Sequence, residues 1–161
     1  MMYDKETETR PLDEQFEIDR ESYRKQIRYL FENSAFYQQK LRQAGFETPE
    51  DVGELDDITH LPFTEKDEIR KTQATAPPFG DHLACDPEDL RRVFSTSGTT
   101  GVPCYLGLTA RDIDMYATNV ARGYTAAGFR PGQRLAVGFE DGLHVALAVE
   151  LGFLRTGLLI G

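Results

Sequence analysis

Apolar residues recur at helical spacing in the first part of the chain. Between residues 18 and 31 they follow one another at intervals of three and four, which predicts an amphipathic helix. A second apolar stripe covers residues 36–44 and stops at Gly45, a residue suited to the position after a helix. Residues 1–15 are polar and charged, and we expect them to form a flexible arm.

Two further short helices are predicted before residue 72. Thr48 precedes Pro49, as an N-cap precedes a first-turn proline. The block 61–67, LPFTEKD, gives a second helix start with Thr64 as the cap and an acidic residue three positions later. Residues 72–87 contain prolines and little periodicity, which indicates an irregular connector. Residues 16–90 are therefore interpreted as a helical N-terminal segment and connector.

The second half of the chain alternates strand and helix patterns. The predicted elements are a strand ending at 93–94, a strand at 105–108, a helix at 109–128 that Thr109 and Asp112 cap, a strand at 135–139, a buried helix at 143–154 and a strand beginning at 157. Strand, helix, strand order predicts a parallel pair that needs further neighbours. Residues 91–161 are therefore expected to be a partial α/β subdomain, and the chain to be the amino-terminal part of a larger protein.

A run of hydroxyls and glycines at 95–101, STSGTTG, connects the first two predicted strands. Glycines allow close approach of the backbone, and successive N–H groups with Ser and Thr hydroxyls offer many donors to an anion. We therefore predict a phosphate-binding loop. The predicted contact residues are Ser97, Gly98, Thr99, Thr100 and Gly101. The alternative is a solvated turn, which short runs of this composition often are.

Charge and hydropathy narrow the range of partners. The 161 residues include 18 basic and 27 acidic side chains, and the net charge of -9 argues against nucleic acid and anionic membranes as the main partners. Residues 81–161 are the less acidic half, which suits an anionic small molecule. No apolar run approaches the roughly 20 residues of a membrane span, and the start has no signal-peptide pattern. A cytoplasmic location is expected.

The two cysteines give no scaffold for a metal or a disulfide network. Cys85 and Cys104 lack CxxC spacing, and their small number fits a reducing compartment. His82 and Cys85 have the spacing of half a metal site, but no second half follows, so no metal site is predicted. Cys104 is interpreted as a small apolar residue rather than a nucleophile, because no histidine lies near it in sequence.

From about Phe16 onward, the chain resembles the phenylacetate-CoA ligase branch of the acyl-adenylate-forming enzymes. The matching stretches are NSAFY at 33–37, LPFTEKD at 61–67, STSGTTG at 95–101 with Pro103, TARD at 109–112 and GFRPG at 128–132. The resemblance implies the fold: a helical segment followed by the start of the α/β N-terminal domain of an adenylate-forming enzyme, truncated after the second strand–helix unit.

The resemblance also implies an activity. Enzymes of this branch couple ATP and Mg²⁺ to a small carboxylate, often aromatic, to give an acyl-adenylate and then a CoA thioester, and they are often homodimers. Phe139 and His144 would then lie in the acyl pocket, although a lone histidine on an apolar helix is more often a core residue. The family commonly has a lysine in or just after the Gly-x-Pro step of the loop, where this chain has Val102 and Cys104.

No catalytic residue is assigned in this chain, because the later family elements, including the lysine that promotes adenylation, lie outside it. The isolated 161-residue chain is therefore expected to be inactive. The alternative function is a non-catalytic module, either a pseudoenzyme or a fragment that self-associates to cover its core.

Overall fold

The computed structural model describes residues 2–96, 103–136, 144–157 and 159–160. The chain divides into two compact units. Arg10–Glu88 form the first, called here the helical unit, and Met1–Thr9 together with Asp89–Gly161 form the second, called here the mixed unit. Within the described residues, no helix is both long enough and apolar enough to cross a membrane.

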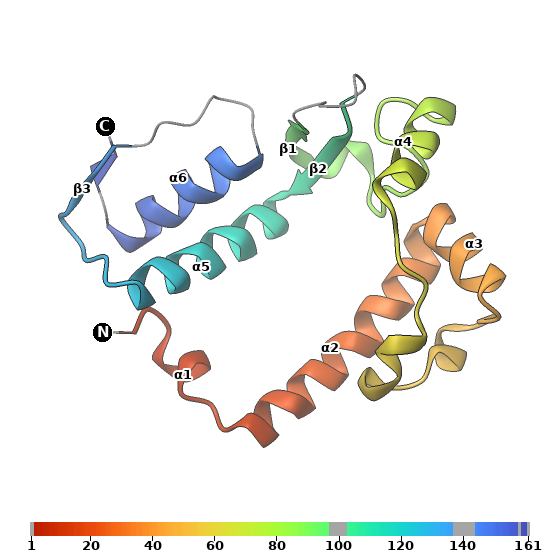
Figure 1. The fold of residues 1–161 in the computed structure, drawn as a ribbon, viewed down its shortest axis with the longest axis horizontal. Helices are drawn as coiled ribbons and strands as arrows, with labels where there is room; N and C mark the ends of the chain where they lie inside the picture. Colours follow the sequence, from red (N-terminus) through yellow and green to blue (C-terminus); the bar gives the residue numbers. More distant parts are fainter. Residues whose placement is uncertain (1, 97–102, 137–143, 158, 161) are drawn as a thin grey trace. The chain divides into compact units, whose positions relative to one another are not determined.

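The helical unit is built around one long helix (Figure 1). Its elements are α2 (Leu12–Asn33), α3 (Ala35–Gln43), the 3₁₀ turns η1 (Pro49–Val52) and η2 (Leu55–His60), and α4 (Lys66–Thr75). The core is formed by one face of α2 together with α3 and η1; its buried members are Tyr23, Ile27, Phe31, Leu41 and Val52. The predicted apolar stripes therefore form a real core.

Two boundaries of the helical unit differ from the sequence prediction. Helix α2 begins at Leu12 rather than near residue 18, because Asp13 and Glu14 in its first turn suit the positive end of the helix dipole. Helix α4 starts after Glu65, so the prediction of Thr64 as its cap is wrong. The Glu68 carboxylate accepts a hydrogen bond from the Glu65 N–H at 2.7 Å, which moves the helix start by one residue.

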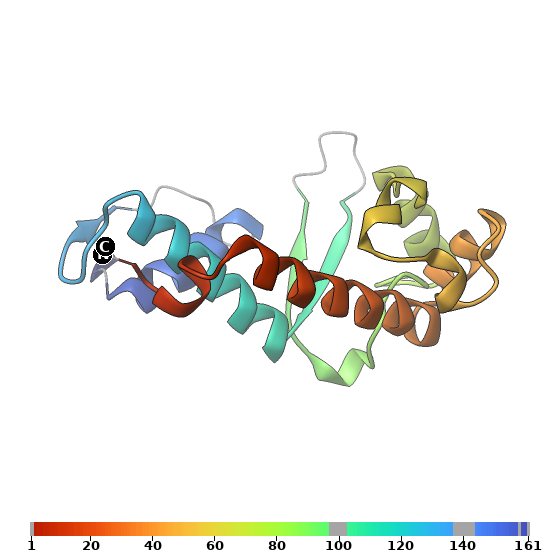
Figure 2. The same cartoon turned by 90° about the horizontal axis from the view of Figure 1, so that it is seen from below.

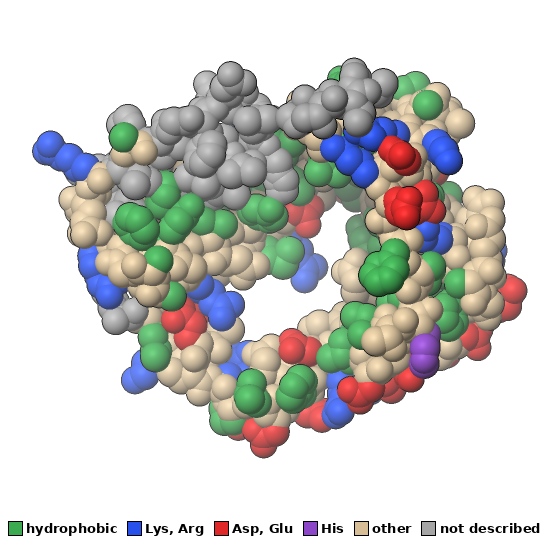
Figure 3. All heavy atoms as spheres, viewed as in Figure 1, with side chains coloured by type: hydrophobic (Ala, Val, Ile, Leu, Met, Phe, Trp, Pro, Cys, Tyr) green, Lys and Arg blue, Asp and Glu red, His purple; other side chains and the backbone are tan. Residues whose placement is uncertain are grey.

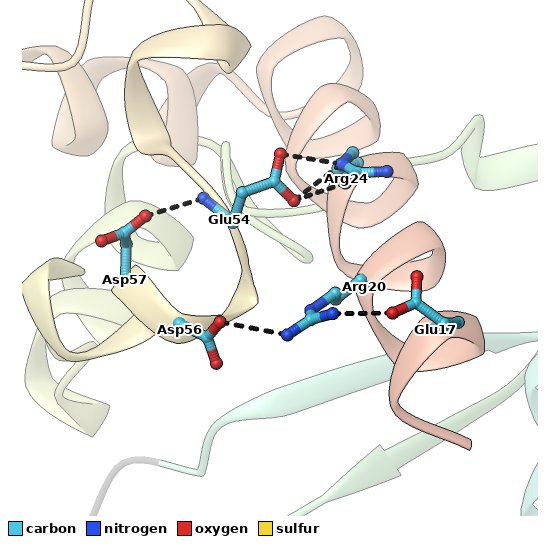
Figure 4. Close-up of polar contacts among 6 residues, drawn as sticks. All are labelled: Glu17, Arg20, Arg24, Glu54, Asp56 and Asp57. Atoms are coloured by element: carbon cyan, nitrogen blue, oxygen red, sulfur yellow. Dashed lines mark hydrogen bonds and ion pairs between the residues drawn. The ribbon is translucent and has the colours of Figure 1, made fainter. Parts of the chain in front are cut away.

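Ion pairs join α2 to the turns that follow α3 (Figure 4). Arg20 bridges Glu17 of its own helix and Asp56 of η2, with distances of 2.7 and 3.3 Å. Arg24 pairs with Glu54 at 2.6 Å. This unit holds 18 of the 27 acidic but only 10 of the 18 basic residues, and acidic side chains recur along its surface in Figure 3. The exposed ion pairs offset part of the repulsion among these acidic side chains, and each contributes little to the stability of the unit.

The mixed unit contains two small sheets and two long helices. Its elements are α1 (Lys5–Glu8), β1 (Leu90–Ser95), β2 (Tyr105–Thr109), α5 (Ala110–Ala126), β3 (Arg134–Leu135), α6 (His144–Thr156) and β4 (Leu159–Ile160), and the turn η3 (Pro87–Asp89) leads into β1. Strands β1 and β2 form an antiparallel ribbon, and Figure 2 shows them side by side. Strands β3 and β4 are parallel, with Arg134 opposite Leu159. The predicted order of an antiparallel hairpin, a helix and a parallel strand–helix–strand unit is confirmed.

Helices α5 and α6 pack closely because small residues face each other. Ala117 and Ala121 of α5 are 2% and 0% exposed. A Cβ atom on Gly152 of α6 would lie 2.2 Å from a methyl group of Val120, so only glycine fits at this crossing. Beyond it, the rings of Tyr124 and Phe153 stack at 4.1 Å. The helix predicted near 143–154 is therefore confirmed as a packed element.

Candidate functional site

The β1–β2 ribbon forms the base of the predicted phosphate loop. Beyond the last strand pair, the Thr96 N–H donates to the carbonyl of Cys104 at 2.9 Å. The Cys104 N–H donates in turn to the Thr96 hydroxyl at 3.1 Å. These two bonds close the ribbon where the loop begins and ends. The predicted phosphate contacts at 97–101, and Val102, lie outside the described residues.

Buried side chains hold the strand ends at the base of the loop. Phe94 and Cys104 are each 2% exposed, which agrees with Cys104 as a small apolar residue. Leu90 lies over Gly107, where a Cβ atom would come within 2.7 Å of the leucine side chain. The two strand ends that hold the loop are thus packed as well as hydrogen-bonded, so the loop is anchored on a rigid element.

The ribbon is also tied directly to helix α5. Thr109 ends β2 and caps the helix: its N–H donates to the Asp112 carboxylate at 2.8 Å, and its hydroxyl accepts from the Asp112 N–H at 3.3 Å. This is the capping box predicted from sequence. Because no linker separates β2 from α5, the orientation of the ribbon is coupled to that of the helix.

Only positive charges lie on the ribbon. From residue 90 to residue 109, the sole charged residues in the sequence are Arg91 and Arg92. Both are exposed, and the Arg92 guanidinium lies 5.7 Å from the centre of the Phe94 ring. In a chain with a net charge of -9, this element is locally cationic, which favours an anionic ligand.

The predicted acyl-pocket residues cannot be positioned from the described side chains. Phe139 lies outside the described residues, and so does the side chain of His144, the first residue of α6. Their assignment to an acyl pocket stays a prediction.

A cleft of about 320 Å³ lies between α5 and α6, and sequence reasoning did not find it. Its lining residues are Ala110, Ile113, Asp114, Ala117, Leu151, Leu154 and Arg155. Asp114 and Arg155 form an ion pair at this cleft, and that hydrogen-bonded carboxylate is the main cause of the raised pKa of Arg155. The volume is at the lower end for small-molecule sites.

His82 contacts a side chain of α4. Its Nδ1 lies 2.9 Å from the Thr72 hydroxyl, and burial lowers the pKa of the imidazole against a smaller opposing effect of Asp81. Among the described residues, no group of three His, Cys, Asp or Glu side chains could hold a metal ion.

Sequence comparison finds similar curated proteins, although no protein-family model matches the chain. A phenylacetate-coenzyme A ligase of Thermus thermophilus is 36% identical over 143 residues, which are 89% of this chain and 31% of that protein. A phenylacetate-coenzyme A ligase of Escherichia coli is 34% identical over 151 residues, covering 93% of this chain and 33% of that protein.

Structure comparison gives a matching result. A crystal structure of 2-hydroxyisobutyryl-CoA ligase, in complex with 2-HIB-AMP and CoA, superposes with a TM-score of 0.86 and 29% identity over 95% of this chain and 32% of that one. A second structure of that ligase, in the postadenylation state, gives a TM-score of 0.84 at 27% identity. The chain thus spans about a third of the length of the relatives it matches.

Proposed function

Because the chain is homologous to the N-terminal third of phenylacetate-CoA ligases, we propose that it supplies the phosphate-binding part of an AMP-forming carboxylate–CoA ligase. In this proposal a carboxylate attacks the α-phosphorus of ATP, which gives an acyl-adenylate and pyrophosphate, and CoA then takes the acyl group as a thioester. The site would hold Mg²⁺ together with ATP. The enzyme would be cytoplasmic.

The observation that carries the proposal is the closed base of the loop. Reciprocal hydrogen bonds between Thr96 and Cys104 fix both ends of the segment that contains residues 97–101. Phosphate oxygens are well held by amides and hydroxyls that are already oriented before the ligand arrives. The amides of Gly98 and Gly101 and the hydroxyls of Thr99 and Thr100 would supply these donors, with Ser97 beside them.

The loop itself carries no positive side chain, so the charge of the phosphates would be neutralised by groups outside the loop. The positions where the family commonly has a lysine are Val102 and Cys104 here. The proposal assigns charge neutralisation to the metal ion that accompanies ATP and to parts of the ligase beyond this chain.

The proposed acid is an aromatic or related small carboxylate. Relatives of this chain carry the names of ligases for phenylacetate and for 2-hydroxyisobutyrate, so similar N-terminal parts occur with different acids. Phe139 and His144 are proposed to contact the acyl group.

The test is release of pyrophosphate from ATP by the gene product that carries this chain, in the presence of a panel of aryl and short branched carboxylates. Release that depends on one of these acids, followed by CoA thioester formation, is the expected result. Absence of release with every acid would favour the alternative, a non-catalytic module. The isolated 161-residue chain is expected to release none.

A homodimer is part of the proposal. The isolated chain is also expected to associate, because in its described part β3 and β4 pair only with each other, over two residues each, and open strand edges favour association. Sedimentation equilibrium of the 161-residue chain should give twice the monomer mass of 18.2 kDa. A concentration-independent monomer would contradict this.

A further inference from the structure

Helix α5 contains a cationic side chain that reaches into the protein. The side chain of Arg122 is 34% exposed, but its Nε atom is buried and has no hydrogen-bond partner among the described residues. A guanidinium N–H that is removed from water without an acceptor is unfavourable. A carboxylate close to Arg122 would offset much of this cost, because it supplies the opposite charge.

Glu8 is a carboxylate in that position. Its Oε1 lies 3.8 Å from Nε of Arg122, and its side chain is 17% exposed. Met1–Thr9 belong to the mixed unit, although Arg10–Glu88 form the helical unit between them and β1. The first residues of the chain therefore complete a unit whose other residues all follow residue 88.

The turn that carries Glu8 is closed by its own hydrogen bonds. The Asp4 carboxylate accepts from the N–H and the hydroxyl of Thr7, at 3.2 and 2.7 Å. Glu8 Oε1 accepts from the N–H groups of Tyr3 and Asp4, at 3.2 and 2.9 Å. These reciprocal bonds fix the direction of the Glu8 side chain before it meets Arg122. Sequence analysis expects a flexible arm over residues 1–15, and this closed turn lies within that range.

Helix α5 links Arg122 to the β1–β2 ribbon without a break. The helix begins directly after Thr109, which is the last residue of β2 and forms the capping box with Asp112. Segments that share a cap and have no linker between them tend to open together in local unfolding. A contact that holds α5 is therefore expected to hold the ribbon as well.

We propose that residues 3–8 form an N-terminal strap that fastens onto α5 through Glu8 and Arg122. One carboxylate closes the turn and also neutralises the arginine, so the strap is attached at a single charged contact. A chain without residues 1–9 would keep the helical unit but would hold α5 and the ribbon less firmly. The strap rests on these contacts and not on the proposed function.

The test is amide hydrogen exchange on the 161-residue chain, comparing Glu8→Gln with Glu150→Gln. Both variants remove one negative charge from the mixed unit, and Glu150 is an exposed residue of α6. With Glu8→Gln, exchange should rise about fivefold in α5 and in the ribbon, because the glutamine no longer offsets the charge of Arg122. Amides of α2 should keep their rates, and Glu150→Gln should match the unchanged chain. Unchanged rates in α5 with Glu8→Gln, or an equal rise in α2, would overturn the proposal.

Arg122→Met separates the ion pair from any other effect of changing Glu8. A methionine needs no counter-charge, so Glu8→Gln should cause little further exchange once Arg122→Met is present. If Glu8→Gln alone fails to fold, the double variant should fold. Additive effects of the two substitutions, or a double variant that also fails to fold, would contradict the strap. Neither experiment needs ATP or an acid.

Discussion

Single side chains hold the segment that leads into β1. Ser34, which is 2% exposed, caps α3 by accepting from the Tyr37 N–H at 3.3 Å. Its hydroxyl also lies 3.3 Å from the carbonyls of Asp81 and His82, and the Tyr29 hydroxyl donates to the carbonyl of Ala84. One buried hydroxyl thus joins the start of a helix to a connector far away in sequence.

Replacement of Ser34 by alanine should therefore destabilise the helical unit. We expect a loss of about 1–2 kcal/mol, because the cap is removed and two partly buried carbonyls lose a donor. Urea unfolding followed by far-ultraviolet circular dichroism measures it. Ser22→Ala, at an exposed position in α2, is the matched control and should change the unfolding free energy by less than about 0.5 kcal/mol. Equal effects of the two variants would show that the Ser34 contacts do not matter.

His82 makes stability depend on pH. Burial lowers its pKa in the folded state below the ordinary value of about 6.5, so the unfolded chain binds more protons as the solution is acidified. The stabilisation is present above about pH 6.5 and is lost as the pH falls through the folded-state pKa. In His82→Gln, the midpoint of unfolding should fall less between pH 7 and pH 5 than in the unchanged chain. The control His60→Gln, at an exposed site, should keep the full acid loss; an identical slope in His82→Gln would contradict the assignment.

At the scale of whole elements, the packing of α6 against α5 depends on close approach of the two helices. The two helices meet where Gly152 faces Val120 and where Ala117 and Ala121 are buried. Their separation leaves no room for one more methyl group at the crossing.

Two glycine replacements in these helices should change the stability of the mixed unit in opposite directions. Gly152→Ala should destabilise the mixed unit by about 1–2 kcal/mol, because the added methyl group collides with Val120. Gly123→Ala in α5 meets nothing within 4 Å and should stabilise by about 0.5–1 kcal/mol through helix propensity. Thermal unfolding followed by circular dichroism compares them. A gain in stability for Gly152→Ala would show that the helices can move apart without cost.

Elements with local signals were predictable, and those that depend on distant partners were not. The hairpin and the Thr109–Asp112 capping box follow from patterns a few residues long, and the parallel order of β3 and β4 follows from the succession of strand, helix and strand. The start of α4 was predicted one residue too early, because Thr64 and Glu65 are each followed three positions later by an acidic residue that could complete a capping box. The Ser34 contacts, the α5–α6 cleft and the Glu8–Arg122 pair join residues far apart in sequence, so no local pattern announces them.

For the whole molecule, the two units differ in charge as well as in structure. The helical unit carries most of the excess acidic residues, whereas the mixed unit holds the cationic ribbon and the base of the predicted loop. An anionic ligand would therefore be drawn to the mixed unit. The chain is homologous to about a third of a CoA ligase, and in the proposed function the mixed unit would supply the phosphate-binding part of the adenylation site.

The measurement that tests this claim most directly is calorimetric titration of the gene product carrying this chain with ATP and Mg²⁺. The unchanged protein should bind. Thr99→Ala and Thr100→Ala should each weaken the affinity about tenfold, the effect of losing one hydrogen bond to a charged group. Thr75→Ala, an exposed threonine in α4, is the matched control and should leave the affinity unchanged. Absence of binding, or affinities unaffected by both loop variants, would contradict the assignment of 97–101 as the phosphate loop.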